Sequence, residues 1–154
     1  MKSPFLASAM IAGVMGFGAA QAQAPVQPVN VVEMRKSGMA LLHGATYRGL
    51  NLAVASKAEP KNFEIPVRGI VEFGKMIPSL FPEAAGPGNR TLPAAFSDRA
   101  GFENAAKALV VAAEELLKIT RDNNAEAFPA AVKAVTDSCG GCHPRTYARS
   151  WIDR

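Results

Sequence analysis

Apolar side chains recur every three or four residues in four separate stretches of this chain, which is the pattern of amphipathic helices. The predicted helices cover, with approximate ends, residues 31–56, 62–80, 97–121 and 125–143. Asn30 and Ser97 are the expected N-caps of the first and third helices. Residues 82–96, between the second and third helices, are predicted to form a loop because they include Pro82, Gly86, Pro87, Gly88 and Pro93.

Short connections join most of the predicted helices, so neighbouring helices are expected to run antiparallel. The sequence therefore predicts an all-α fold, an antiparallel up-down-up-down four-helix bundle, whose helices of about 20 residues are about 30 Å long. Gly38, Gly44 and Gly49 weaken the first helix intrinsically. We expect these glycines to permit close approach to a neighbouring helix or to a flat ligand.

Two thiols and an imidazole lie together near the end of the chain, in the sequence Cys139-Gly140-Gly141-Cys142-His143. Two cysteines three residues apart and followed at once by histidine form the attachment signature of a c-type haem. Residues i and i+3 of a helix share one face, so both sulfurs reach the vinyl groups on one edge of a porphyrin. The motif predicts one covalently attached haem c, bound through Cys139 and Cys142, with His143 as the proximal iron ligand.

Two other kinds of site use cysteines at this spacing. A redox dithiol or a disulfide normally lies at the start of a helix in a strand-rich domain, where the helix dipole lowers the thiol pKa. This pair instead lies near the chain end, with no alternating strand pattern around it. A zinc site needs about four ligands. With His43, the chain contains a Cys₂His₂ set, but about 100 residues separate its two halves.

The first residues have the pattern of a secretory signal peptide. Lys2 precedes a short apolar run, and small residues typical of a cleavage site follow it. The run is short and rich in glycine and alanine, which disfavours a membrane span. Cleavage is expected after Ala22, or else after Ala24, which assigns residues 1–22 to the signal peptide and residues 23–154 to a single domain. An uncleaved membrane anchor is the alternative.

Charge and export restrict the expected partners. The chain has 17 basic and 13 acidic residues, and loss of Lys2 with the signal leaves a net charge of about +3. This charge is too mild and too dispersed for nucleic-acid binding. Because covalent haem attachment belongs to compartments outside the cytoplasm, the motif and the signal together predict a periplasmic protein. Its expected partners are periplasmic redox proteins, and no stable membrane insertion is expected after signal cleavage.

The chain resembles the cytochrome c-prime family, the class II c-type cytochromes, over nearly all of residues 23–154. The resemblance rests on four helices, on the haem-attachment sequence in the last of them, and on Met34-Arg35-Lys36-Ser37-Gly38-Met39 in the first. Family members commonly have Arg-x-x-x-(Met/Leu/aromatic) there. Leu80-Phe81-Pro82-Glu83 and Phe96-Ser97-Asp98-Arg99-Ala100-Gly101-Phe102 also look like this family. No methionine follows Cys142, which excludes the arrangement of the common small electron carriers.

The resemblance implies that a residue of the first helix lies at the sixth coordination position of the iron. In one branch of the family a methionine ligates the iron, and in the other a bulky apolar residue blocks the distal face of five-coordinate iron. Met39 occupies this position, and a thioether is a normal haem ligand, so Met39 is the expected distal ligand. The alternatives are an unligated Met39 and ligation by His43, one turn further along. The resemblance also implies that Arg35 contacts a haem propionate, unless it is a solvated surface residue.

The predicted function is a periplasmic c-type cytochrome that transfers single electrons, with His143 and Met39 as axial ligands. The alternative is a five-coordinate, high-spin cytochrome c-prime that binds NO or CO. No catalytic base lies in an obvious constellation, so an enzyme is not expected. The resemblance further implies a homodimer through the first two helices. The chain departs from the family at Pro144, which tends to kink the last helix, and Arg145, Tyr147 or Arg149 is expected to replace the family's proximal basic residue.

Overall fold

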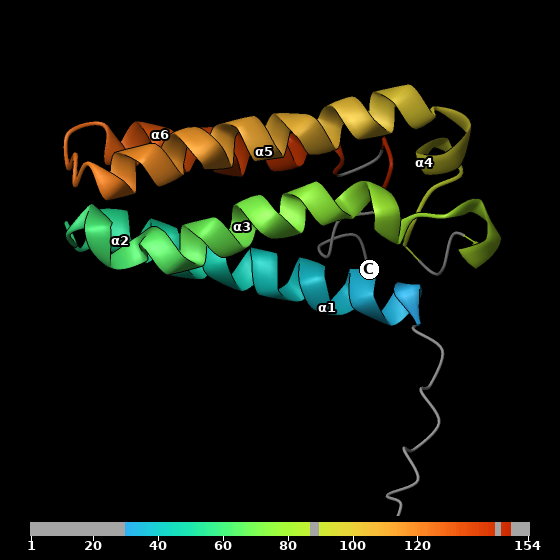
Figure 1. Cartoon of the computed structure of the whole chain (residues 1–154), viewed down its shortest axis with the longest axis horizontal. Coiled ribbons are helices and arrows are strands. Elements are labelled where there is room, and N and C mark those ends of the chain that lie inside the picture. The colour runs from blue at the N-terminus through green and yellow to red at the C-terminus, as the bar shows by residue number, and fades with distance from the viewer. Residues whose placement is uncertain (1–29, 87–89, 144–145, 149–154) are drawn as a thin grey trace, which may run out of the picture.

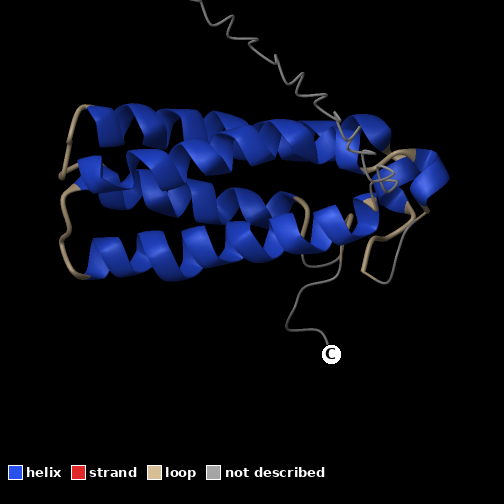
Figure 2. Ribbon diagram, turned by 60° about the horizontal axis from the view of Figure 1, so that its bottom comes forward, coloured by secondary structure: helices blue, strands red, loops and turns tan. Residues whose placement is uncertain are grey.

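Four helices lie side by side and alternate in direction in the computed structural model, which describes residues 30–86, 90–143 and 146–148 (Figures 1 and 2). The first helix comprises α1 (Val31–His43), the π-helical segment η1 (Gly44–Leu50) and α2 (Asn51–Ala55). The second comprises the 3₁₀ segment η2 (Pro60–Phe63), α3 (Glu64–Met76) and the 3₁₀ segment η3 (Ile77–Leu80). The third is α5 (Arg99–Arg121), and the fourth is α6 (Phe128–Ser138), continued by the 3₁₀ turn η5 (Cys139–Gly141). The predicted all-α, antiparallel up-down-up-down bundle is confirmed.

The long predicted loop contains two short helices at one end of the bundle, η4 (Glu83–Ala85) and α4 (Ala94–Ser97) (Figure 1). Within the described residues, β-structure is limited to one isolated bridge between Thr91 and Ala148. The predicted signal peptide, residues 1–22, lies outside the described residues. None of the helices in the described ranges has both the length and the hydropathy of a membrane-spanning segment.

The helix caps agree with the sequence in one case and differ in the other. The Asn30 side chain accepts hydrogen bonds from the backbone N–H groups of Val32 (3.1 Å) and Glu33 (3.2 Å), as predicted. The third helix, in contrast, is capped by Asp98, which accepts from the backbone N–H of Gly101 (3.1 Å). The prediction of Ser97 was wrong because Ser97 ends α4, where its backbone N–H donates to the carbonyl of Pro93 (3.1 Å).

The fourth helix is shorter than the apolar pattern suggests. Its regular part begins at Phe128, with Pro129 in the first turn, where proline is well accommodated. It ends at Ser138, before Gly140 and Gly141, whose low helix propensity disfavours a further α-helical turn. The tighter 3₁₀ turn η5 therefore begins with Cys139 and is followed directly by Cys142.

The core is formed mainly where α5 packs against α3 and α6. Its fully buried apolar side chains include Val67 of α3, Ala113 and Leu116 of α5, and Val135 of α6. Burying a valine or leucine side chain contributes about 1.5–3 kcal/mol relative to exposure. The third helix is thus the element on which the second and fourth helices are assembled.

Gly38 permits close contact between α1 and α3. A Cβ atom at this position would overlap the ring of Phe73 in α3. The expectation of a close approach is confirmed for Gly38, whereas a Cβ at Gly44 would meet nothing within 4 Å.

We expect Gly38→Ala to lower the free energy of unfolding by about 1–3 kcal/mol, because the added methyl group overpacks the contact with Phe73. Gly69→Ala in α3 is the matched control. A Cβ at Gly69 meets nothing within 4 Å, so this change should raise stability by about 0.5–1 kcal/mol through the loss of glycine's backbone freedom. Urea unfolding of the two variants measures both changes in the free energy of unfolding. Changes of the same sign and size in the two variants would contradict the packing argument.

The segment after the haem-attachment sequence folds back onto the start of α5. The Tyr147 hydroxyl donates to Asp98 Oδ2 at 2.6 Å, and its ring lies edge-on to Phe102, with 5.6 Å between ring centroids. The Tyr147 side chain is buried, so the segment that carries it is packed against the bundle. Pro144, Arg145 and Arg149, which the sequence analysis singled out, lie outside the described residues.

Asp98 makes the stability of this attachment dependent on pH. The hydrogen bond from Tyr147, followed by that from the Gly101 backbone, lowers the pKa of Asp98 below its ordinary value. Because the folded-state pKa is the lower one, the stabilisation is fully present above the unfolded value of about 4 and is lost as the pH falls through the folded-state pKa. We expect Asp98→Asn to flatten the acid side of the stability curve, measured by urea unfolding across that range. A curve parallel to the wild type would contradict this assignment.

Candidate functional site

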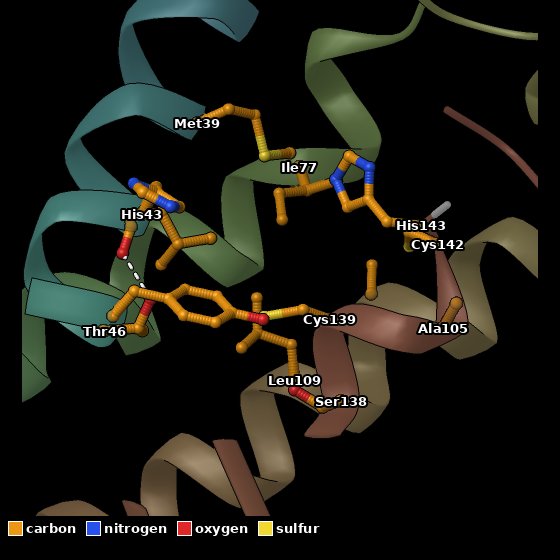
Figure 3. A pocket seen from close by; sticks show the side chains of 13 residues that line it. Met39, His43, Thr46, Ile77, Ala105, Leu109, Ser138, Cys139, Cys142 and His143 are labelled. Atoms are coloured by element: carbon orange, nitrogen blue, oxygen red, sulfur yellow. Dashed lines mark hydrogen bonds between the residues drawn. The ribbon is translucent and has the colours of Figure 1, made fainter. Parts of the chain in front are cut away.

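One cavity of about 270 Å³ brings together the residues that the sequence analysis selected (Figure 3). Its walls come from the first helix, the end of the second, the middle of α5 and the C-terminal turn. The lining residues are Met39, Leu42, His43, Thr46, Tyr47, Ile77, Ala105, Ala106, Leu109, Ser138, Cys139, Cys142 and His143. Both thiols, the imidazole and the thioether thus face a single, largely apolar space.

The two cysteines are aligned by the 3₁₀ turn. The backbone N–H groups of Cys142 (3.2 Å) and His143 (3.0 Å) both donate to the carbonyl of Cys139. Side chains at i and i+3 lie on the same side of such a turn, so both thiols are able to reach one edge of a flat group. A Cβ at Gly141 would lie 3.5 Å from the Cβ of Ala105, so the turn rests closely on α5.

The environment of the thiols differs from that of a dithiol redox site. Burial raises the pKa of Cys139, and burial followed by the charge of Cys139 raises the pKa of Cys142 to about 11. Reactive dithiol sites lower this pKa so that a thiolate forms near neutral pH. The shift is therefore opposite to the one that thiol–disulfide exchange requires.

The zinc alternative also lacks support in the geometry. His43, Cys139, Cys142 and His143 all border the cavity. In the part of the chain that the structure describes, however, no three or more cysteine, histidine or acidic side chains converge in a metal-binding group.

Met39 and His143 project into the cavity from opposite walls (Figure 3). Met39 comes from α1 and packs against the core cluster, whereas His143 follows the C-terminal turn; both side chains are half-buried. Two potential ligands that face each other across an apolar space are what an axially ligated, flat cofactor requires.

The wall of the cavity that contains Met39 also carries polar side chains. Thr46 is buried, and its hydroxyl donates to the carbonyl of Leu42 at 2.8 Å. The rings of His43 and Tyr47 stack with 5.1 Å between centroids, and both residues are exposed at the edge of the cavity. The sequence analysis did not select Thr46, because its position depends on the π-helical segment η1, for which the sequence has no clear signal.

Arg35 is buried but does not line the cavity. Its Nε donates to the carbonyl of Leu80 and its Nη1 to that of Gly86 (3.1 Å), and its guanidinium lies 4.2 Å from the ring centroid of Phe81. Its Nη2 is buried and has no hydrogen-bond partner among the described residues. Arg35 is therefore not a solvated surface residue, and the propionate contact remains a prediction.

Solved structures with the same fold are cytochromes c prime. A nitric oxide complex of a variant from Alcaligenes xylosoxidans has 20% sequence identity and a TM-score of 0.69, and the match covers 78% of this chain and 94% of that one. The cytochrome c' from Rubrivivax gelatinosus has 24% identity and a TM-score of 0.66, with coverage of 77% and 94%. At these identities the likeness concerns the fold alone.

Sequence comparison adds the evidence at the level of the family. No curated protein sequence matches the chain. The family model described as Cytochrome C' matches residues 30–146, which include every element of the bundle and the complete haem-attachment sequence. The chain therefore belongs to the cytochrome c' family, whose members carry a covalently attached haem c.

Proposed function

We propose that this protein is a periplasmic one-electron carrier in which Cys139 and Cys142 attach the haem, His143 is the proximal iron ligand and Met39 is the distal one. The observation that carries the proposal is the approach of Met39 and His143 from opposite walls of the cavity that also contains both thiols. Ligation from both sides saturates the iron, which favours electron transfer over the binding of an external ligand.

The residues of the cavity fit a haem. Ala105 and Ala106 present short side chains along α5, which leaves room for a flat ring system. Leu42, Ile77 and Leu109 supply apolar surface to cover it. The buried Nη2 of Arg35, without a partner in the described ranges, is a donor suited to a carboxylate such as a haem propionate.

Each group of residues has a definite part in electron transfer. When bound, the haem supplies the one-electron couple of its iron. The two cysteines fix the position of the ring, and Met39 raises the reduction potential relative to a second histidine. Leu42, Ile77 and Leu109 exclude water, and a rigid apolar surrounding limits the rearrangement that accompanies a change of charge.

The second candidate is a five-coordinate cytochrome c' that binds NO or CO. Met39 packs against the buried core cluster, so its side chain is able to cover the distal face without ligating the iron. The structural neighbour from Alcaligenes xylosoxidans is a nitric oxide complex. The spectroscopic experiment below separates the two candidates.

The family and the surface support the proposed location and assembly. Cytochromes c' are periplasmic, which agrees with a signal peptide over residues 1–22 and a mature domain over residues 23–154. Leu41 and Leu52 of the first helix and Ile65 of the second are strongly exposed, at 75%, 67% and 73%. This apolar surface suits a homodimer through the first two helices.

We expect the wild-type protein to be low-spin, with a sulfur-to-iron absorption band near the red edge of the spectrum and no uptake of CO. Met39→Leu should convert it to a high-spin protein that binds CO, because leucine keeps the bulk of methionine but provides no ligand. Met76→Leu is the matched control, since Met76 lies on α3 outside the cavity and is 44% exposed. Methionine-to-leucine changes cost less than about 1.5 kcal/mol, so both variants should fold.

A high-spin wild type that takes up CO as readily as Met39→Leu would reject the electron carrier and favour the gas-binding candidate. A low-spin spectrum that survives in Met39→Leu would identify a different sixth ligand, with His43 the first to test.

Haem attachment is tested separately from iron ligation. The matured protein should exceed its polypeptide mass by one haem after denaturation, and the double variant Cys139→Ala/Cys142→Ala should lose this increment completely, because each thioether bond needs a cysteine sulfur. The measurement is intact mass spectrometry together with haem staining of a denaturing gel. Haem that remained covalently bound in the double variant would place the attachment elsewhere.

A further inference from the structure

We propose that Tyr147 is a positioning residue for the proximal iron ligand, acting through its hydrogen bond to Asp98. The proposal rests on the assignment of His143 as the proximal ligand of a haem c, and it does not depend on whether Met39 occupies the sixth position. Its starting point is that a buried side chain four residues after His143 is attached to the helix that forms a wall of the haem cavity.

The backbone of Tyr147 is joined directly to the haem-attachment turn. The backbone N–H groups of Tyr147 (3.1 Å) and Ala148 (3.2 Å) both donate to the carbonyl of Cys142. This carbonyl belongs to the peptide group that leads into His143. A displacement of Tyr147 therefore changes the orientation of the peptide that carries the imidazole.

The side chain of Tyr147 is in turn fixed to the bundle. Its hydroxyl donates to Asp98 Oδ2 at 2.6 Å, while Asp98 Oδ1 accepts from the Gly101 backbone at the start of α5. One carboxylate thus caps α5 and fixes the segment that follows the iron ligand. A second connection comes from the backbone N–H of Leu92, which donates to the Tyr147 carbonyl at 2.8 Å.

The local sequence is adapted to this arrangement at Gly101. A Cβ at this position would overlap both Asp98 Oδ2 and the hydroxyl oxygen of Tyr147. Glycine therefore leaves the space in which the carboxylate and the phenol meet. The edge-on contact of the Tyr147 ring with Phe102 limits the remaining rotation of the ring.

The helix α5 is in contact with both the haem cavity and the segment that contains Tyr147. Ala105 and Leu109, further along this helix, line the haem cavity, and the attachment turn rests on Ala105. The hydrogen bond between Tyr147 and Asp98 therefore fixes the iron ligand and the haem cavity relative to one helix. Such outer contacts commonly orient a metal ligand and tune the metal, as hydrogen bonds to ligating histidines do.

Tyr147→Phe tests the proposal because it removes the hydroxyl and keeps the ring against Phe102. In the holo-protein we expect a shifted midpoint potential and an altered electron paramagnetic resonance spectrum of the oxidised iron, since both respond to the orientation of the axial imidazole. Asp98→Asn should shift the potential in the same direction, and the double variant should shift it no further than Tyr147→Phe alone. Asp122→Asn is the matched control, because Asp122 follows the opposite end of α5 and pairs with Lys118 at the surface.

A purely structural role predicts a different result. Tyr147→Phe would then lower the melting temperature while the potential and the resonance spectrum stayed at their wild-type values, and this outcome would overturn the proposal, as would additive shifts in the double variant. The test is independent of the sixth ligand. A high-spin wild type would reject Met39 ligation, but the comparison between wild type and Tyr147→Phe would still be decisive.

Discussion

The contact between the Cys139–Gly141 turn and α5 is the constraint on which the rest of the site depends. In the proposed haem site, two thioether bonds and one axial bond would reach the same flat ring, which requires the turn to lie close to the wall of the cavity. The chain meets this condition with small residues on both sides, Gly141 on the turn and Ala105 on α5. A Cβ at Gly141 would already be in van der Waals contact with Ala105, so a side chain longer than that of alanine would press the turn away from the wall. The same helix packs against α3 and α6. The helix that supports the attachment turn is therefore also the one that packs most extensively within the bundle.

The two sides of the cavity are built in different ways. On one side, His143 follows a tight turn whose carbonyl groups accept hydrogen bonds from later residues of the chain, and Tyr147 attaches the chain again at Asp98. On the other side, Met39 lies within the long first helix, and its neighbour Gly38 lets that helix approach Phe73 closely. His143 is thus held in place by hydrogen bonds of the turn and of Tyr147, whereas Met39 is held in place by the packing of α1. In the proposed site, a change in the packing of α1 would therefore affect the sixth coordination position before it affects haem attachment.

Much of this arrangement was predictable because it is encoded locally. Helical periodicity gave the four helices, and the spacing of Cys139, Cys142 and His143 gave the cofactor. The position of Met39 opposite His143 was expected only through resemblance to a family, since periodicity does not say which helix faces which. The Asp98 cap was missed because Ser97 and Asp98 are both good caps, and the choice between them depends on α4 and on Tyr147. The π-helical segment and the carbonyl partners of Arg35 likewise depend on contacts between distant parts of the chain.

The contacts of Arg35 with backbone carbonyls are compatible with the propionate contact that the family resemblance implies. Its guanidinium joins the end of the second helix to the following loop through the carbonyls of Leu80 and Gly86, and it lies over the ring of Phe81. Arginine remains charged when it is buried, and a buried charge without a counter-ion is costly. Neutral carbonyls satisfy some of its donors but do not balance its charge. An anionic group beside Nη2 would balance it, and a haem propionate supplies such a group. Binding of the cofactor would then complete the packing of the end of the bundle at which the second helix and the loop meet.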